Sequence, residues 1–232
     1  MAARLITILA VAVAIVATAA EEQVWLSQGV TIHVTDSVHF TLSNTMYLEH
    51  GEYFCDEEAF SARWKLSERW AVGGGASYSQ DRVERVRGEP PDDVYIRHHW
   101  DWSGRPTEHL ALDWSYPVGD WIFMDSHRIY MYFREDERDW AVYRNIATVT
   151  APPVPHLPWS PRPYFTQFIY FSGRDCYDGH DRFSQFRSVI GMSVTPLEHL
   201  SLSAYWQYRD IETPSCDWVQ VRIVGLYAKL VF

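Results

Sequence analysis

The stretch Val224-Gly225-Leu226-Tyr227-Ala228-Lys229-Leu230-Val231-Phe232 closes the chain and indicates its fold class. Apolar side chains occupy every second position of this stretch, with glycine, tyrosine, lysine and valine between them. Successive side chains of a β-strand point to opposite faces, so a strand with one apolar face is predicted. A strand of a soluble sandwich can carry this alternation. A strand of a transmembrane barrel requires it, because one face meets lipid and the other meets the lumen.

The N-terminal segment predicts export from the cytoplasm. Arg4 supplies a positive charge, residues 5–17 are apolar apart from Thr7, and small residues continue to Ala20. A positive start, an apolar centre and small residues at the cleavage position are typical of a secretory signal peptide. We therefore expect residues 1–20 to be a cleaved signal peptide and residues 21–232 to form one outer-membrane barrel domain.

Composition narrows the class of protein. The chain has 232 residues and a net charge of -10, which argues against a nucleic-acid partner because such a partner needs basic patches. Outside the N-terminal segment, no apolar run approaches the roughly 20 residues of a membrane-spanning helix. Aromatic residues make up 16% of the chain, including 11 Trp and 14 Tyr. Amphipathic aromatic rings collect at membrane interfaces, which favours a barrel over a soluble sandwich.

The same alternation recurs along the chain and is clearest in residues 200–209, where leucine, alanine, tryptophan and tyrosine alternate with polar residues. Further stretches that we interpret as strands are 24–34, 40–48, 60–66, 70–79, 108–116, 126–134, 139–150, 164–171, 182–195 and 224–232. No segment shows a sustained helical period. The predicted fold is all-β, a transmembrane antiparallel up-and-down β-barrel.

The number of strands depends on how the connections are interpreted. Short turns are expected at 35–37, 67–69, 117–121 and 195–198, and longer connections at 50–58, 80–107, 172–181 and 210–217. Placing short turns in the periplasm gives about eleven strands, with the N-terminus on the side opposite to that usual in bacterial barrels. Counting residues 94–102 as a further strand gives the even number usual in these barrels, so we expect about twelve strands, within a range of about ten to twelve.

Three cysteines, Cys55, Cys176 and Cys216, are interpreted as loop residues. An odd number allows at most one intramolecular disulfide, and we expect Cys176 and Cys216 to form it because their loops flank adjacent strand pairs. No C-x-x-C pair occurs, which excludes a zinc ribbon. We expect neither a metal site built on such a motif nor a cofactor.

Several motifs resemble a Gram-negative outer-membrane family known as domain of unknown function 2490. They are Trp25, the stretch 126–134 followed by 135–140, Tyr143-Arg144-Asn145, Arg162-Pro163-Tyr164, Asp181-Arg182-Phe183 and the closing aromatic strand. The resemblance covers most of the mature chain and implies an outer-membrane barrel with no established activity. The family's strand at 126–134 usually alternates arginine and glutamate, whereas this chain has Tyr130 and Tyr132 at those positions.

If the apolar faces meet lipid, polar residues line the lumen. The candidate lining residues are Arg63, Lys65, Asp113, Arg128, Tyr130, Tyr132, Arg134, Arg187, Gln207, Arg209 and Lys229, with Gln167 and Gln185 beside them. This wall is basic although the protein is acidic. The acids lie in the expected connections, among them Asp56, Glu57, Glu58, Glu89, Asp92, Asp93, Glu135, Asp136, Glu137, Asp175 and Asp217.

These residues predict a narrow passive channel for small anionic solutes, with an acidic rim that holds divalent cations. The alternative is a structural or ligand-binding barrel whose lumen is filled, since barrels of about eight strands are filled and those of about 16–18 are open.

A lipid-modifying enzyme is the third class considered. Ser126 and His127 point to opposite faces of a strand, and no G-x-S-x-G motif occurs, so we expect no catalytic residues and no enzyme. The expected location is the bacterial outer membrane, and the expected partners are its lipids and the barrel-assembly machinery. We expect that machinery to bind the last strand, with Phe232 as the signal.

Overall fold

Eleven β-strands make up the computed structural model, which describes residues 23–49, 52–87, 97–133, 140–172, 183–212 and 218–232. The strands are β1 (Gln23–His33), β2 (Val38–Glu49), β3 (Glu52–Lys65), β4 (Trp70–Arg87), β5 (Arg97–Val118), β6 (Trp121–Tyr132), β7 (Trp140–Thr150), β8 (Arg162–Ser172), β9 (Phe183–Leu197), β10 (Leu200–Glu212) and β11 (Trp218–Val231). Among these residues there is no helix with the length and apolarity needed to cross a membrane.

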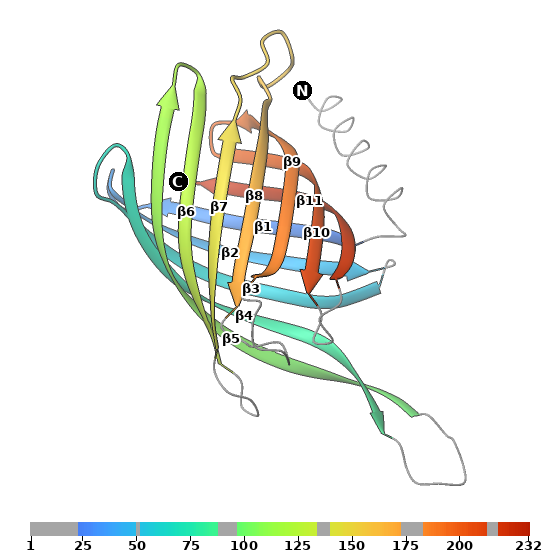
Figure 1. The fold of residues 1–232 in the computed structure, drawn as a ribbon. Coiled ribbons are helices and arrows are strands. Elements are labelled where there is room, and N and C mark those ends of the chain that lie inside the picture. Colours follow the sequence, from blue (N-terminus) through green and yellow to red (C-terminus); the bar gives the residue numbers. More distant parts are fainter. Residues whose placement is uncertain (1–22, 50–51, 88–96, 134–139, 173–182, 213–217) are drawn as a thin grey trace, which may run out of the picture.

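The strands close into one barrel in which each strand pairs with its neighbours in the sequence (Figure 1). All consecutive pairs are antiparallel, as expected for an up-and-down barrel. The closing pair differs, because β1 and β11 run parallel, with Val24 beside Val224 and Thr31 beside Val231. An odd number of strands that all alternate in direction must meet in a parallel seam.

The barrel has one strand fewer than the preferred twelve and lies within the expected range. Most of the residues counted as an additional strand, 94–102, belong to β5, which pairs with β4 from Arg97 to Trp114. The connection-length rule gave the number of strands that is observed, and the preference for an even number added one too many.

The β4–β5 hairpin is much longer than expected and projects beyond the rest of the barrel (Figure 1). β4 has 18 residues and β5 has 22, so the expected connection at 80–107 is largely strand. The expected connection at 50–58 is also mostly strand, because β3 begins at Glu52. Asp56, Glu57 and Glu58 are therefore strand residues of β3 and not part of an acidic loop.

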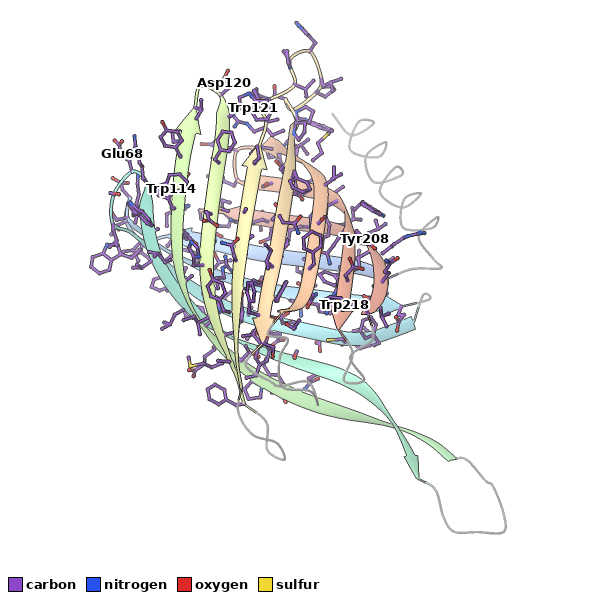
Figure 2. All side chains as sticks on the ribbon, in the orientation of Figure 1. Glu68, Trp114, Asp120, Trp121, Tyr208 and Trp218 are labelled. Atoms are coloured by element: carbon purple, nitrogen blue, oxygen red, sulfur yellow. The ribbon has the colours of Figure 1, made fainter. Side chains whose placement is uncertain are left out.

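The outer face of the barrel is apolar and exposed. Leu42, Leu110 and Ile190 alternate with lumen-facing neighbours, and each exposes more than half of its surface. Figure 2 shows Trp114 and Trp121 at one end of the barrel and Tyr208 and Trp218 at the opposite end. An apolar belt between two aromatic ends is the pattern expected of a wall that meets lipid.

The seam is closed by the last residue as well as by the parallel pair. The backbone N–H of Phe232 donates to the carbonyl of Thr31 at 2.9 Å, and the N–H of His33 donates to the carbonyl of Phe232. The Phe232 ring stacks on His199, with 5.4 Å between ring centroids. Phe232 thus joins β1, β11 and the β9–β10 turn at one end of the barrel.

Candidate functional site: the barrel lumen

The lumen holds a cavity of about 1040 Å³ lined by side chains from all eleven strands. Alternation along each strand places polar and aromatic residues on its wall. Of the candidate lining residues, the structure places Arg128, Tyr130, Tyr132, Arg187, Gln207 and Arg209 on this cavity.

The remaining candidates among the described residues do not line this cavity, although Arg63 shares the inward face of β3 with the lining residue Ser61. Asp113 is buried on the same face of β5 as His109, which lines the cavity. Lys229 lies two residues after the lining residue Tyr227 and faces the same side of β11. Lys65 is exposed at the end of β3. The predicted lining residue Arg134, the disulfide between Cys176 and Cys216, and most of the acidic connections lie outside the described residues.

Two predictions are wrong. Gln167 was expected inside, but it faces outward between the lining residues Thr166 and Phe168, and its side-chain Oε1 accepts a hydrogen bond of 2.9 Å from the Ser188 hydroxyl. Cys55 was expected in a loop, but it is buried in β3 and lines the lumen.

One ion pair anchors a hydrogen-bond network across β3, β5 and β6. Arg63 Nε contacts Asp113 Oδ2 at 2.6 Å, and the buried Ser126 hydroxyl donates to Asp113 Oδ1 at 2.6 Å. Arg128 Nε donates to Ser126 Oγ at 3.2 Å and reaches the Tyr130 hydroxyl at 3.4 Å through Nη1. Asp113 therefore compensates the charge of Arg63 and organises the side chains beside it.

Arg144, which the sequence analysis missed, lies among aromatic rings on β6 and β8. Its guanidinium carbon is 4.2 Å from the centroid of the Tyr130 ring and 5.5 Å from that of Tyr170, and Nη1 donates to the Tyr170 hydroxyl at 3.3 Å. The centroid of the Phe168 ring lies 5.9 Å from the same guanidinium carbon. Cation–π contacts of this kind hold an arginine in place without neutralising its charge.

Arg187 and Arg209 form a second basic group, on β9 and β10. They are direct cross-strand partners and both line the cavity. Arg187 lies over the Tyr170 ring, 4.8 Å from its centroid, and over Trp25 at 5.6 Å. In the amide orientation that satisfies both arginines, the Gln185 side-chain oxygen accepts hydrogen bonds from Arg187 and Arg209.

Positive charge dominates the cavity wall. Its described lining includes four arginines, at positions 128, 144, 187 and 209, and one carboxylate, that of Glu57. Glu57 accepts a hydrogen bond of 2.8 Å from the Tyr47 hydroxyl. A concave, low-dielectric wall with one sign of charge concentrates counter-ions.

Aromatic residues and glycines form a cross-strand row over six strands, and the rings partly fill the lumen. The cross-strand row is Tyr164, Gly191, Tyr205, Gly225, Trp25 and Tyr47. The Tyr164 ring occupies the space over Gly191, and the Tyr205 ring occupies the space over Gly225. Glycine at these positions lets each ring lie flat against the barrel wall.

We expect Gly225→Ala to destabilise the barrel by about 1–3 kcal/mol, because a Cβ there would overlap the Tyr205 ring and force it from its position. Urea unfolding, followed by the gel mobility of unheated samples, measures the change. The double variant Gly225→Ala/Tyr205→Ala has no ring to displace. Its loss of unfolding free energy should therefore be smaller than the sum of the losses in Gly225→Ala and Tyr205→Ala. A loss equal to that sum would contradict the packing argument.

The outer wall carries a polar cluster around His127, on the face opposite to Ser126. His127 Nδ1 lies 2.6 Å from the Tyr143 hydroxyl, and Nε2 lies 3.2 Å from Asp125 Oδ2. Asn145 donates to Asp125 Oδ1 at 2.6 Å. These groups satisfy one another, which lowers the cost of placing them on an apolar face. Ser126 instead faces inward, so strand parity separates the two residues as expected.

Comparison with known proteins supports the fold. No family model matches the chain, and no curated protein matches it by sequence. Among solved structures, the porin NanC in a rhombohedral crystal form is similar, with a TM-score of 0.50 and 12% identity over 84% of this chain and 86% of that one. The outer-membrane protein OmpT of Vibrio cholerae, folded in vitro, gives a TM-score of 0.38 and 11% identity over 82% of this chain and 56% of that one. The chain therefore has the closed all-β barrel fold found in outer-membrane proteins.

Proposed function

We propose that this protein is a narrow passive channel of the bacterial outer membrane that favours small anions. The observation that carries the proposal is the lumen wall, where four arginines face one carboxylate among the described lining residues. The apolar outer face and the similarity to an outer-membrane porin support a barrel embedded in that membrane. Export by residues 1–20, contact with outer-membrane lipids and membership of the family of domain of unknown function 2490 belong to the same proposal.

The last strand supports recognition by the barrel-assembly machinery. Phe232 is exposed at the end of the seam, where its backbone groups bond to both Thr31 and His33. A segment that completes the barrel is suited to recognition before closure, when its edge is unpaired.

A structural or ligand-binding barrel with a filled lumen is the second candidate function. Tyr164, Tyr205 and Arg144 project into the lumen, and eleven strands lie between the roughly eight of filled barrels and the roughly 16–18 of open ones. This candidate predicts no ion flow, whereas the channel requires it.

Recording from the refolded full-length protein in planar lipid bilayers separates the two. In a potassium chloride gradient we expect stepwise conductance and a reversal potential that shows chloride to be more permeant than potassium. Protein that shows the heat-dependent gel mobility of a folded barrel yet conducts no current would overturn the channel. A reversal potential showing preference for potassium would overturn the anion selectivity.

A further inference from the structure

Arg187 and Arg209 place two positive charges at one cross-strand position of the lumen wall. Like charges directly opposite each other destabilise a strand pair, and the effect grows where water is partly excluded. Within the part of the chain that the structure describes, neither guanidinium has a carboxylate partner. Arg63 provides the contrast, because it is paired with Asp113 on the same wall.

The two guanidiniums converge on a single oxygen. With its amide oxygen turned toward them, Gln185 accepts hydrogen bonds from both Arg187 and Arg209. A neutral amide supplies only a partial negative charge at this point. Two guanidinium groups that donate to one acceptor form an arrangement suited to binding an oxyanion.

Buried donors without partners lie on the same cavity wall. Gln207 is 3% exposed, and its Nε2 has no hydrogen-bond partner. The indole N–H of Trp25, whose ring lies under Arg187, also has none, and Nε of the neighbouring Arg144 has none. Buried polar groups are nearly always hydrogen-bonded, so unsatisfied donors on one cavity wall indicate a missing acceptor.

We propose that Arg187 and Arg209, together with Gln185 and Gln207, form a binding site for the oxyanion group of a small solute, a carboxylate or a phosphate. A carboxylate or phosphate is rich in acceptor oxygens and matches a wall that offers donors. Binding compensates two like charges that are otherwise opposed across β9 and β10. In the proposed channel, this site is where a permeating solute pauses, and in that role it rests on the proposed function. Binding itself does not require that the lumen conducts ions.

Isothermal titration calorimetry of the refolded full-length protein in detergent tests the site, with inorganic phosphate and succinate as separate probes at constant ionic strength. We expect saturable binding of at least one probe, and the two titrations show which oxyanion is preferred. Arg209→Met should weaken binding by about tenfold or more, as expected for the loss of a charged hydrogen bond. Gln207→Leu keeps every charge and should also weaken binding, because it removes the unpartnered donor.

Lys65→Met is the matched control, since it removes one positive charge from the exposed end of β3 and should leave the affinity within about twofold, as a screened distant charge allows. Wild-type protein that binds neither probe saturably overturns the site. A loss of affinity in Lys65→Met equal to that in Arg209→Met also overturns it, because only net charge would then matter. Saturable binding without conductance contradicts the channel alone, and conductance without saturable binding contradicts the site alone.

Discussion

If the protein conducts anions as proposed, Arg187→Glu is expected to reduce the preference for anions over cations by about tenfold. The substitution changes the charge at one position of the lumen wall by two units. At about 8 Å in a water-like dielectric, each unit contributes roughly 0.5 kcal/mol to the energy of a passing monovalent ion. The barrier for an anion rises and the barrier for a cation falls by similar amounts. Salt screening reduces the sum of these two changes to roughly 1.4 kcal/mol, which corresponds to the tenfold change in preference.

The barrel should remain folded in this variant, because the introduced carboxylate would face Arg209 across β9 and β10 and replace two opposed like charges with a cross-strand pair of opposite sign. Reversal potentials in a salt gradient, measured on refolded protein in planar bilayers, give the permeability ratio. The control is Lys65→Glu, which makes the same charge change at the exposed end of β3 and should shift the ratio much less. If both variants shift it equally, the selectivity arises from net charge and not from this part of the wall.

The alternation of side chains predicted the fold because lipid and lumen impose opposite demands on successive residues. In β10, Leu202 and Trp206 face outward while Gln207 and Arg209 line the cavity, as their sequence positions indicate. The same reasoning located Arg187 and Arg128. Where apolar and polar residues alternate strictly along a strand, the residues that face the lumen can be predicted from the sequence alone.

β7 shows where this reasoning fails. Val142 and Ile146 are buried on the lumen side, while Tyr143 and Asn145 face outward, so polarity runs opposite to the usual pattern. Arg144 was therefore not predicted as a lining residue, although its guanidinium lies over the rings of Tyr130 and Tyr170. The partners that make Asn145 acceptable outside lie on β6, and local alternation contains no information about them.

The β4–β5 hairpin and the seam escaped prediction for other reasons. Apolar and polar residues do not alternate regularly in residues 80–87, so the pattern that identifies a strand is lost while backbone pairing continues from Gln80 to Arg87. The parallel pairing of β1 with β11 is a property of closure. It follows from the number of strands and not from any single segment.

Asp113→Asn is expected to lower the free energy of unfolding by about 2 kcal/mol. Removing one partner of a fully buried ion pair costs about 3–5 kcal/mol, because the other charge is left uncompensated. Here the Asp113 side chain is 9% exposed but that of Arg63 is 37% exposed, so water recovers part of the loss and the cost approaches that of one charged hydrogen bond, about 1.5–3 kcal/mol. The Ser126 hydroxyl keeps an acceptor in the amide oxygen, which confines the loss to the contact with Arg63.

Urea unfolding of the refolded barrel, with the slope checked for constancy, measures this loss. A double-mutant cycle with Arg63→Met isolates the pair: the double variant should be about 1.5 kcal/mol more stable than the two single losses added together, because once one charge has gone the other has no ion pair left to lose. Ser126→Ala serves as the comparison: it removes a hydrogen bond to the same carboxylate but leaves the ion pair in place, and should cost about 1.5 kcal/mol. A cycle in which the losses add would show that Arg63 and Asp113 are not energetically coupled in the lumen, whatever their 2.6 Å separation, and the anchoring role of Asp113 would then fail.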